Sequence, residues 1–102
     1  MTDALVVLTT APDEAMAEAL AEALVNEGLA ACVHILPAGR SFYRWQGAVH
    51  KEPEWTLVIK TDTVRYVPLQ TRLTVLHPYE VPEVIAVPVV EGLPAYLAWL
   101  KG

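Results

Sequence analysis

The sequence is poor in cysteine, in basic residues and in long apolar runs, and each shortage excludes a class of protein. Cys32 is the single cysteine of 102 residues, so no disulfide forms within the chain, which is typical of a reducing compartment. Seven Lys and Arg against twelve Asp and Glu give a net charge of −5. This balance argues against nucleic-acid binding, because phosphates are held by basic clusters.

No apolar run approaches the roughly 18 residues that a membrane-spanning helix requires. The amino terminus carries no basic segment followed by a long apolar run, so no secretory signal is visible. We therefore expect a cytoplasmic protein that does not bind a membrane.

Hydrophobic residues are abundant where charge is scarce. They make up 54% of the chain and charged residues only 19%, which is more apolar than an average soluble domain. A chain of this length forms a single domain, residues 1–102, with one core. Without a membrane segment to absorb it, the apolar surplus indicates an oligomer interface.

Residues 30–61 predict two long strands folded back on each other, with a turn at Trp45-Gln46-Gly47. The first arm is interrupted at residues 37–39, and the second has a charged break at residues 51–54. Pro53 indicates an irregular or edge position there. A typical strand has about five or six residues, and these arms are about twice as long. We therefore expect another copy of the protein to bury part of the hairpin.

Strands and helices alternate on either side of this hairpin. Apolar runs at residues 4–10 and 84–89 predict strands. Helical spacing of apolar residues predicts one helix that ends at Gly28 and a short closing helix over residues 92–100.

A further helix follows the capping pair Asp62-Thr63, and Pro68 places the start of its regular part near Tyr66. The resulting βαββαβ order predicts an α+β, ferredoxin-like sandwich, with both helices on one face of an antiparallel sheet. The opposite face has no element of its own to cover it. Three copies of the chain could pack these faces together.

Cys32 and His34 are the first candidate metal ligands. They stand two residues apart on a predicted strand, so they share a face at a spacing of about 7 Å. A thiolate with an imidazole suits copper or zinc. The alternative, which we favour within one chain, is an ordinary buried cysteine beside a histidine that happens to follow it. Ligands gathered across a symmetric oligomer would favour metal binding.

The loop of residues 77–83 carries an imidazole, a phenol and two carboxylates, on His77, Tyr79, Glu80 and Glu83. Such a set serves acid–base chemistry or metal binding, or forms a rigid connector with a charged rim. No nucleophile–base pair and no phosphate-binding glycine loop accompanies it. Binding is therefore favoured over catalysis, and we expect no enzyme.

Tyr43, Trp45 and Trp55 cluster around the hairpin, where aromatic residues more often anchor an interface than stack on a ligand. Lys60, at the end of an apolar run, is available to pair with one of three acids, Glu54, Glu80 or Glu83. That pairing could be structural.

Several motifs resemble the CutA divalent-cation tolerance proteins and occur in that family's order. They are Ala30-Ala31-Cys32-Val33, Tyr43-Arg44-Trp45-Gln46-Gly47, Ile59-Lys60-Thr61, His77-Pro78-Tyr79-Glu80-Val81-Pro82-Glu83 and Tyr96-Leu97-x-Trp99. The run that begins at His77 is the most specific of them, and together they span nearly the whole chain.

The resemblance implies a compact homotrimer, related in shape to the nitrogen-regulatory PII proteins and associated with tolerance to copper and other divalent cations. It implies Cys32 as a copper ligand and an inter-subunit cleft lined by Trp45, Lys60, His77, Tyr79 and Glu83. Glu54 falls where the family tends to place an acid. His34 stands where the family often has Asn, and it either adds a ligand or is neutral.

Two hypotheses follow, neither with an organic cofactor. The first is a trimer that binds divalent metal, copper foremost, through Cys32, His34, His77 and Glu83. The second is a PII-like signalling or scaffold trimer that binds a small molecule or a protein in clefts lined by Tyr43, Trp45, Glu54, Lys60, Tyr79 and Glu80. An enzyme built on the paired carboxylates Glu80 and Glu83 is the weakest alternative.

Overall fold

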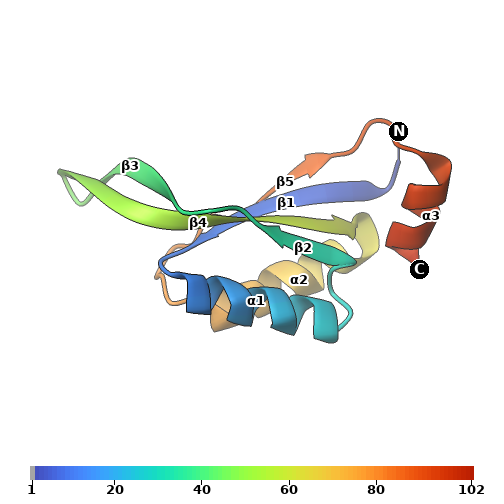
Figure 1. Ribbon diagram of the computed structural model, residues 1–102, viewed down its shortest axis with the longest axis horizontal. Coiled ribbons are helices and arrows are strands. Elements are labelled where there is room, and N and C mark those ends of the chain that lie inside the picture. The colour runs from blue at the N-terminus through green and yellow to red at the C-terminus, as the bar shows by residue number, and fades with distance from the viewer. Residues whose placement is uncertain (1) are drawn as a thin grey trace.

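The computed structural model describes residues 2–102, and its elements follow the predicted order (Figure 1). The strands in that range are β1 (Ala4–Ala11), β2 (Cys32–Ile35), β3 (Gly39–Trp45), β4 (Ala48–Asp62) and β5 (Ile85–Pro88). The helices are α1 (Glu14–Asn26), α2 (Thr63–Leu76) and α3 (Pro94–Lys101).

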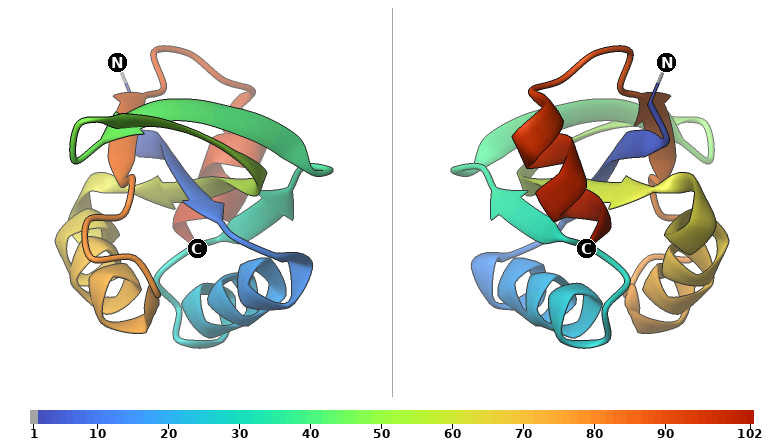
Figure 2. Two further views of the ribbon diagram at one scale, coloured as in Figure 1. Left: turned by 90° about the vertical axis from the view of Figure 1, so that its left-hand side faces the viewer. Right: turned by 90° about the vertical axis from the view of Figure 1, so that its right-hand side faces the viewer.

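The strands form an antiparallel sheet in the order β2-β4-β1-β5, and β3 pairs with β4 beyond this path. Helices α1 and α2 lie side by side on one face of the sheet (Figure 2). Alternate residues of the central strands point toward them and meet the helix leucines in a buried core, which includes Val7, Leu20, Leu24, Leu57, Ile59, Leu69 and Leu73. This is the predicted arrangement, with the helices on one side of the sheet.

The hairpin of β3 and β4 extends beyond the helices and lengthens the molecule to 45 Å, against 25 and 24 Å in the other directions (Figure 1). Gln46 and Gly47 both have positive φ angles, 50° and 82°, the geometry of a two-residue type I′ turn. Phe42 and Val49 on the two arms are 67% and 66% exposed. The hairpin therefore presents apolar side chains that its own chain does not cover.

The predicted charged break at residues 51–54 is wrong, because β4 is continuous from Ala48 to Asp62. Trp55 pairs with Ala11, the last residue of β1. Residues 48–54 of β4 lie beyond the end of β1. In the described chain they pair with β3 on one side and with no strand on the other. Pro53 therefore occupies an edge, where its missing N–H breaks no ladder hydrogen bond.

The predicted start of α2 near Tyr66 is also wrong, because the helix begins at Thr63. Asp62 caps it by accepting a 3.0 Å hydrogen bond from the backbone N–H of Arg65. Pro68 lies inside the helix, where it deprives the Val64 carbonyl of its N–H partner. Pro68 and Val64 are both exposed, so this carbonyl lies on the water side and the helix continues.

The sheet face opposite α1 and α2 is apolar. Strand alternation and register place on it Val6, Leu8, Val58, Ile85 and Val87. Helix α3 packs against β1 and β4 at the end away from the hairpin tip (Figure 1), and Ile85 and Val87 are 52% and 49% exposed. Much of this open face is therefore uncovered in one chain. Among residues 2–102, no helix is long and apolar enough to cross a membrane.

Candidate functional site

A cleft of about 580 Å³ lies where the hairpin meets the loop that follows α2. Its lining combines aromatic, acidic and small polar residues: Thr10, Ser41, Phe42, Tyr43, Trp45, Glu54, Tyr79, Glu80, Val81 and Glu83. Five of the six residues predicted for the small-molecule cleft are among them; Lys60 is not, and neither is His77, which the resemblance also implied as cleft lining. Glu83, predicted as a metal ligand and as cleft lining, also lies here.

Glu54 is fixed in this cleft through both carboxylate oxygens. The Ser41 hydroxyl donates to Oε1 at 2.5 Å, and the Tyr79 hydroxyl donates to Oε2 at 2.7 Å. Burial and the hydrogen bond to Glu54 raise the pKa of Tyr79 far above its ordinary value. Tyr79 is therefore a neutral hydrogen-bond donor at physiological pH. Each carboxylate oxygen of Glu54 retains a further lone pair for a ligand.

His77 holds the loop in place beneath the cleft. Its Nε2 lies 2.6 Å from the carbonyl oxygen of Thr10, which can only accept, so Nε2 carries the proton. Nδ1 accepts a 3.1 Å hydrogen bond from the backbone N–H of Tyr79, and the two rings lie 4.7 Å apart. The side chain is buried and both ring nitrogens have partners. His77 thus positions Tyr79 and presents no free nitrogen in this conformation.

The two faces of the hairpin carry opposite charge. Register and alternation place Ser41, Tyr43 and Trp45 on the same face as Glu52 and Glu54, and Tyr43 stacks on His50 with ring centroids 5.3 Å apart. The basic side chains of the hairpin lie on the reverse face: Arg40, Arg44 and Lys51.

Sequence reasoning missed Thr10, Ser41, Phe42 and Val81 as lining residues. Alternation along residues 41–45 could have found Ser41, because it shares a face with Tyr43 and Trp45. Nothing in the sequence pairs Thr10 with a loop that begins 67 residues later.

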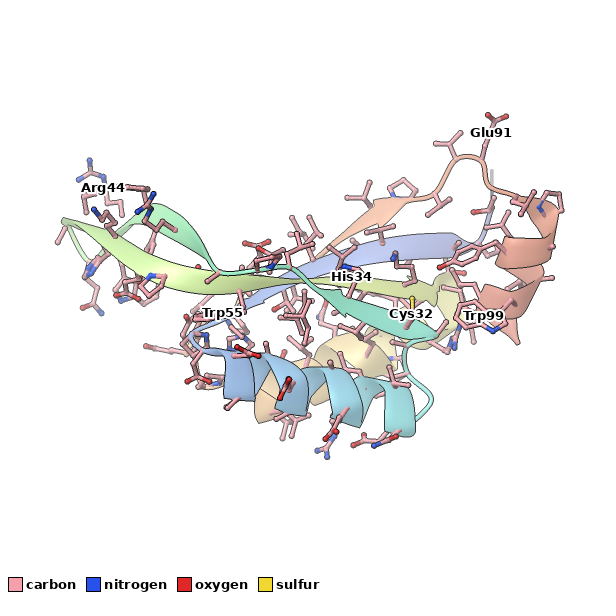
Figure 3. All side chains as sticks on the ribbon, viewed as in Figure 1. Cys32, His34, Arg44, Trp55, Glu91 and Trp99 are labelled. Atoms are coloured by element: carbon pink, nitrogen blue, oxygen red, sulfur yellow. The ribbon has the colours of Figure 1, made fainter. Side chains whose placement is uncertain are left out.

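Cys32, His34 and Lys60 lie elsewhere, on the open sheet face (Figure 3). Cys32 pairs with Lys60 across the β2–β4 ladder, and His34 with Val58. The Cys32 sulfur lies 3.9 Å from the Tyr96 hydroxyl on α3. Lys60 stands six positions after Glu54 along β4, a distance of roughly 20 Å. Within one chain, Lys60 therefore does not reach the cleft acids.

The four predicted metal ligands are likewise divided between two places. Cys32 and His34 are on the open face, whereas His77 and Glu83 belong to the cleft and its loop. In the part of the chain that the structure describes, no group of three or more His, Cys, Asp or Glu is placed to hold a metal ion. A complete metal site would need residues from more than one copy.

Nearly the whole chain matches known proteins. A family model described as CutA1 divalent ion tolerance protein matches residues 5–102. The chain belongs to the CutA1 divalent ion tolerance family. A divalent-cation tolerance protein CutA from Thermus thermophilus is 50% identical over 96 residues, which cover 94% of this chain and 93% of that protein.

Solved CutA structures share the fold. The one from Thermus thermophilus has a TM-score of 0.94 and 49% identity, covering 96% of this chain and 95% of that chain. The one from Xylella fastidiosa has a TM-score of 0.94 and 47% identity, with coverages of 97% and 95%. CutA1 membership confirms the resemblance and the ferredoxin-like α+β fold. It also makes the chain a tolerance protein and not an enzyme.

Proposed function

We propose that this CutA1 family member is a trimer that binds divalent metal ions, copper foremost, and contributes to cation tolerance in this way. The observation that carries the proposal is the placement of Cys32 and His34 on the apolar sheet face that one chain leaves largely uncovered. A symmetric packing of these faces around the β2 end can bring several copies of both side chains toward one axis.

Two features support the trimer. The open face exposes Ile85 and Val87, and the hairpin exposes Phe42 and Val49, so two surfaces of one chain carry large apolar side chains. Exposed apolar patches of this kind mark interaction sites, and three copies can cover each other's.

Shared ligation follows from what one chain can supply. Cys32 and His34 provide one thiolate and one imidazole per copy, and the remaining ligands of a copper or zinc site then come from neighbouring copies. The expected stoichiometry is therefore below one metal per chain. His77 and Glu83 form a second candidate pair, but His77 must first give up one of its two hydrogen bonds.

The experiment is an anaerobic calorimetric titration of the trimer with copper(II), and with zinc(II) as a metal that does not oxidise the thiol. Variants Cys32→Ser, His34→Ala and His77→Ala separate the two candidate pairs. His50→Ala is the matched control, because His50 stacks on Tyr43 in the hairpin, outside both pairs. Isotherms unchanged in all three test variants would overturn the proposed ligands.

The second candidate function is a PII-like signalling or scaffold trimer that binds a small molecule or protein in its clefts. The cleft of about 580 Å³ favours it, since this volume is typical of small-molecule sites. The ammonium of Lys60 opposite Cys32 also favours it, because a positive charge there opposes a divalent cation. A thermal-shift screen of metals, nucleotides and organic acids discriminates: stabilisation by metals alone contradicts this function.

We also propose that the chain acts in the cytoplasm. A relative of known structure from Archaeoglobus fulgidus is described as periplasmic, so cell fractionation is the direct test.

A further inference from the structure

We propose that the cleft at the base of the hairpin binds a small organic cation, with a guanidinium or substituted ammonium group held between aromatic rings and carboxylates. This deepens the second candidate function and rests on it, because it names the class of molecule that the cleft would take.

The charges that line the cleft are all of one sign. Glu54, Glu80 and Glu83 face it, and no Lys, Arg or His lines it in residues 2–102. Glu52 lies on the same hairpin face and adds a fourth carboxylate nearby. The lysine and arginines of the hairpin are on its reverse side, whereas His50 shares the acidic face and stacks on Tyr43.

Aromatic rings supply the rest of the walls: Tyr43, Trp45 and Tyr79. Ring faces attract cations within about 6 Å, and Trp is the strongest of the aromatic side chains in this respect. In one chain, Trp45 and Tyr43 are 41% and 39% exposed.

These carboxylates suit an organic cation better than a metal ion. A divalent metal needs several oxygen ligands at about 2.0–2.6 Å from one point. In the described residues, no three acids, histidines or cysteines approach that closely. A guanidinium or alkylammonium group spreads its charge over several atoms, so it can interact with carboxylates that are farther apart than metal ligands. Its carbon atoms pack against the rings.

The acidic group at the centre of the cleft is positioned in advance. Ser41 and Tyr79 fix Glu54, and His77 in turn fixes Tyr79 through its backbone N–H and its ring. A ligand that binds Glu54 therefore meets a carboxylate whose side chain is already ordered, which lowers the entropy lost on binding.

The test is a calorimetric titration with methylguanidinium and with its uncharged isostere methylurea. Tetramethylammonium is added as a cation without hydrogen-bond donors. We expect both cations to bind and methylurea to bind at least tenfold more weakly. Glu80→Gln should weaken cation binding about fivefold, because one carboxylate near the ligand contributes about 1 kcal/mol in a solvent-exposed site. Glu80 is exposed, so this variant is expected to fold.

Glu91→Gln is the matched control, because this substitution removes the same net charge as Glu80→Gln. Glu91 lies at the end of the molecule away from the hairpin (Figure 3). Equal binding of methylguanidinium and methylurea, or equal weakening by Glu80→Gln and Glu91→Gln, would overturn the cation site. The same panel includes ATP and citrate as anions. Binding of an anion alone would overturn this inference and leave the small-molecule function standing, whereas no binding by any of them would sink both.

Discussion

Tyr79 and Glu54 stand 25 residues apart in the sequence and are joined by a 2.7 Å hydrogen bond from the phenol to Oε2. This bond ties the loop after α2 to the base of the hairpin. The same loop is tied to the end of β1, because His77 contacts the carbonyl of Thr10. Three separate parts of the chain thus meet around one carboxylate.

Removing the phenol should loosen this junction without removing the ring. We expect Tyr79→Phe to lower the free energy of unfolding by about 1 kcal/mol, because Glu54 loses one hydrogen-bond partner and keeps Ser41. Urea denaturation measures the change. Combination with Glu54→Ala, which leaves the phenol no side-chain acceptor at this position, in a double-mutant cycle isolates the pair. Strict additivity of the two substitutions would show that the contact contributes nothing.

Asp62 should make stability dependent on pH in the acid range. Burial disfavours its carboxylate, but hydrogen bonds and the charge of Arg65 outweigh this and hold the pKa of Asp62 below its ordinary value. Because the pKa of Asp62 is lower in the folded state than in the unfolded state, its carboxylate stabilises the protein at pH values above the unfolded-state pKa. This stabilisation is lost as the pH falls through the folded-state pKa.

Asp62→Asn should therefore destabilise the protein by about 1 kcal/mol near neutral pH, and by progressively less in acid. Denaturation of both proteins at a series of pH values measures the difference. Asp13→Asn removes the charge at the cap of α1 and keeps an oxygen that can accept, so it controls for the loss of a cap charge alone. A difference that grew on acidification would contradict the assignment to Asp62.

The contact between Arg65 and the last helix offers a further test. The guanidinium binds Asp62 and also donates to the carbonyl oxygen of Leu100 at 2.6 Å. A lysine cannot hold both partners with the same geometry. Arg65→Lys should lower stability by about 1 kcal/mol and speed amide hydrogen exchange in α3 more than in α1. Equal effects on the two helices would show that the contact does not anchor α3.

Trp45 should matter for assembly. It is 41% exposed near the hairpin tip, and a bulky aromatic in that position is suited to burial by a second copy. Light scattering on dilution measures the protein concentration at which the assembly dissociates. For Trp45→Ala this concentration should be at least tenfold higher than for the parent protein. Val64→Ala, on the exposed side of α2, is the control. An unchanged, equally heat-stable trimer would count against the hairpin as an assembly element.

Patterns within single elements were predictable, and relations between distant elements were not. Alternation and turn residues predicted the hairpin, a turn at Trp45-Gln46-Gly47 and an interruption at residues 37–39, although the structure places Gly39 and Trp45 in β3. Pro53 lies at an open sheet edge, as predicted, whereas Pro68 misled the prediction of where α2 begins, because the carbonyl left without its N–H partner faces water. Whether a proline is tolerated is decided by tertiary neighbours.

The candidate site shows the same division. Motif resemblance implied that Trp45, Lys60 and Tyr79 line one inter-subunit cleft, and within a single chain the long β4 separates Lys60 from the other two. The role of His77 as a buried support for Tyr79 depends on the Thr10 carbonyl, which no local pattern could reveal.

The division of charge across the hairpin also bears on solubility. β3 pairs with β4 on one side only in the described chain, so its other edge offers unpaired backbone groups to any passing strand. Arg40 and Arg44 stand along that edge, and a second β3 brought alongside would set arginines against arginines. An acidic or neutral strand would not meet this repulsion. The hairpin can therefore remain long, apolar and exposed during synthesis while discouraging fibres built from copies of itself.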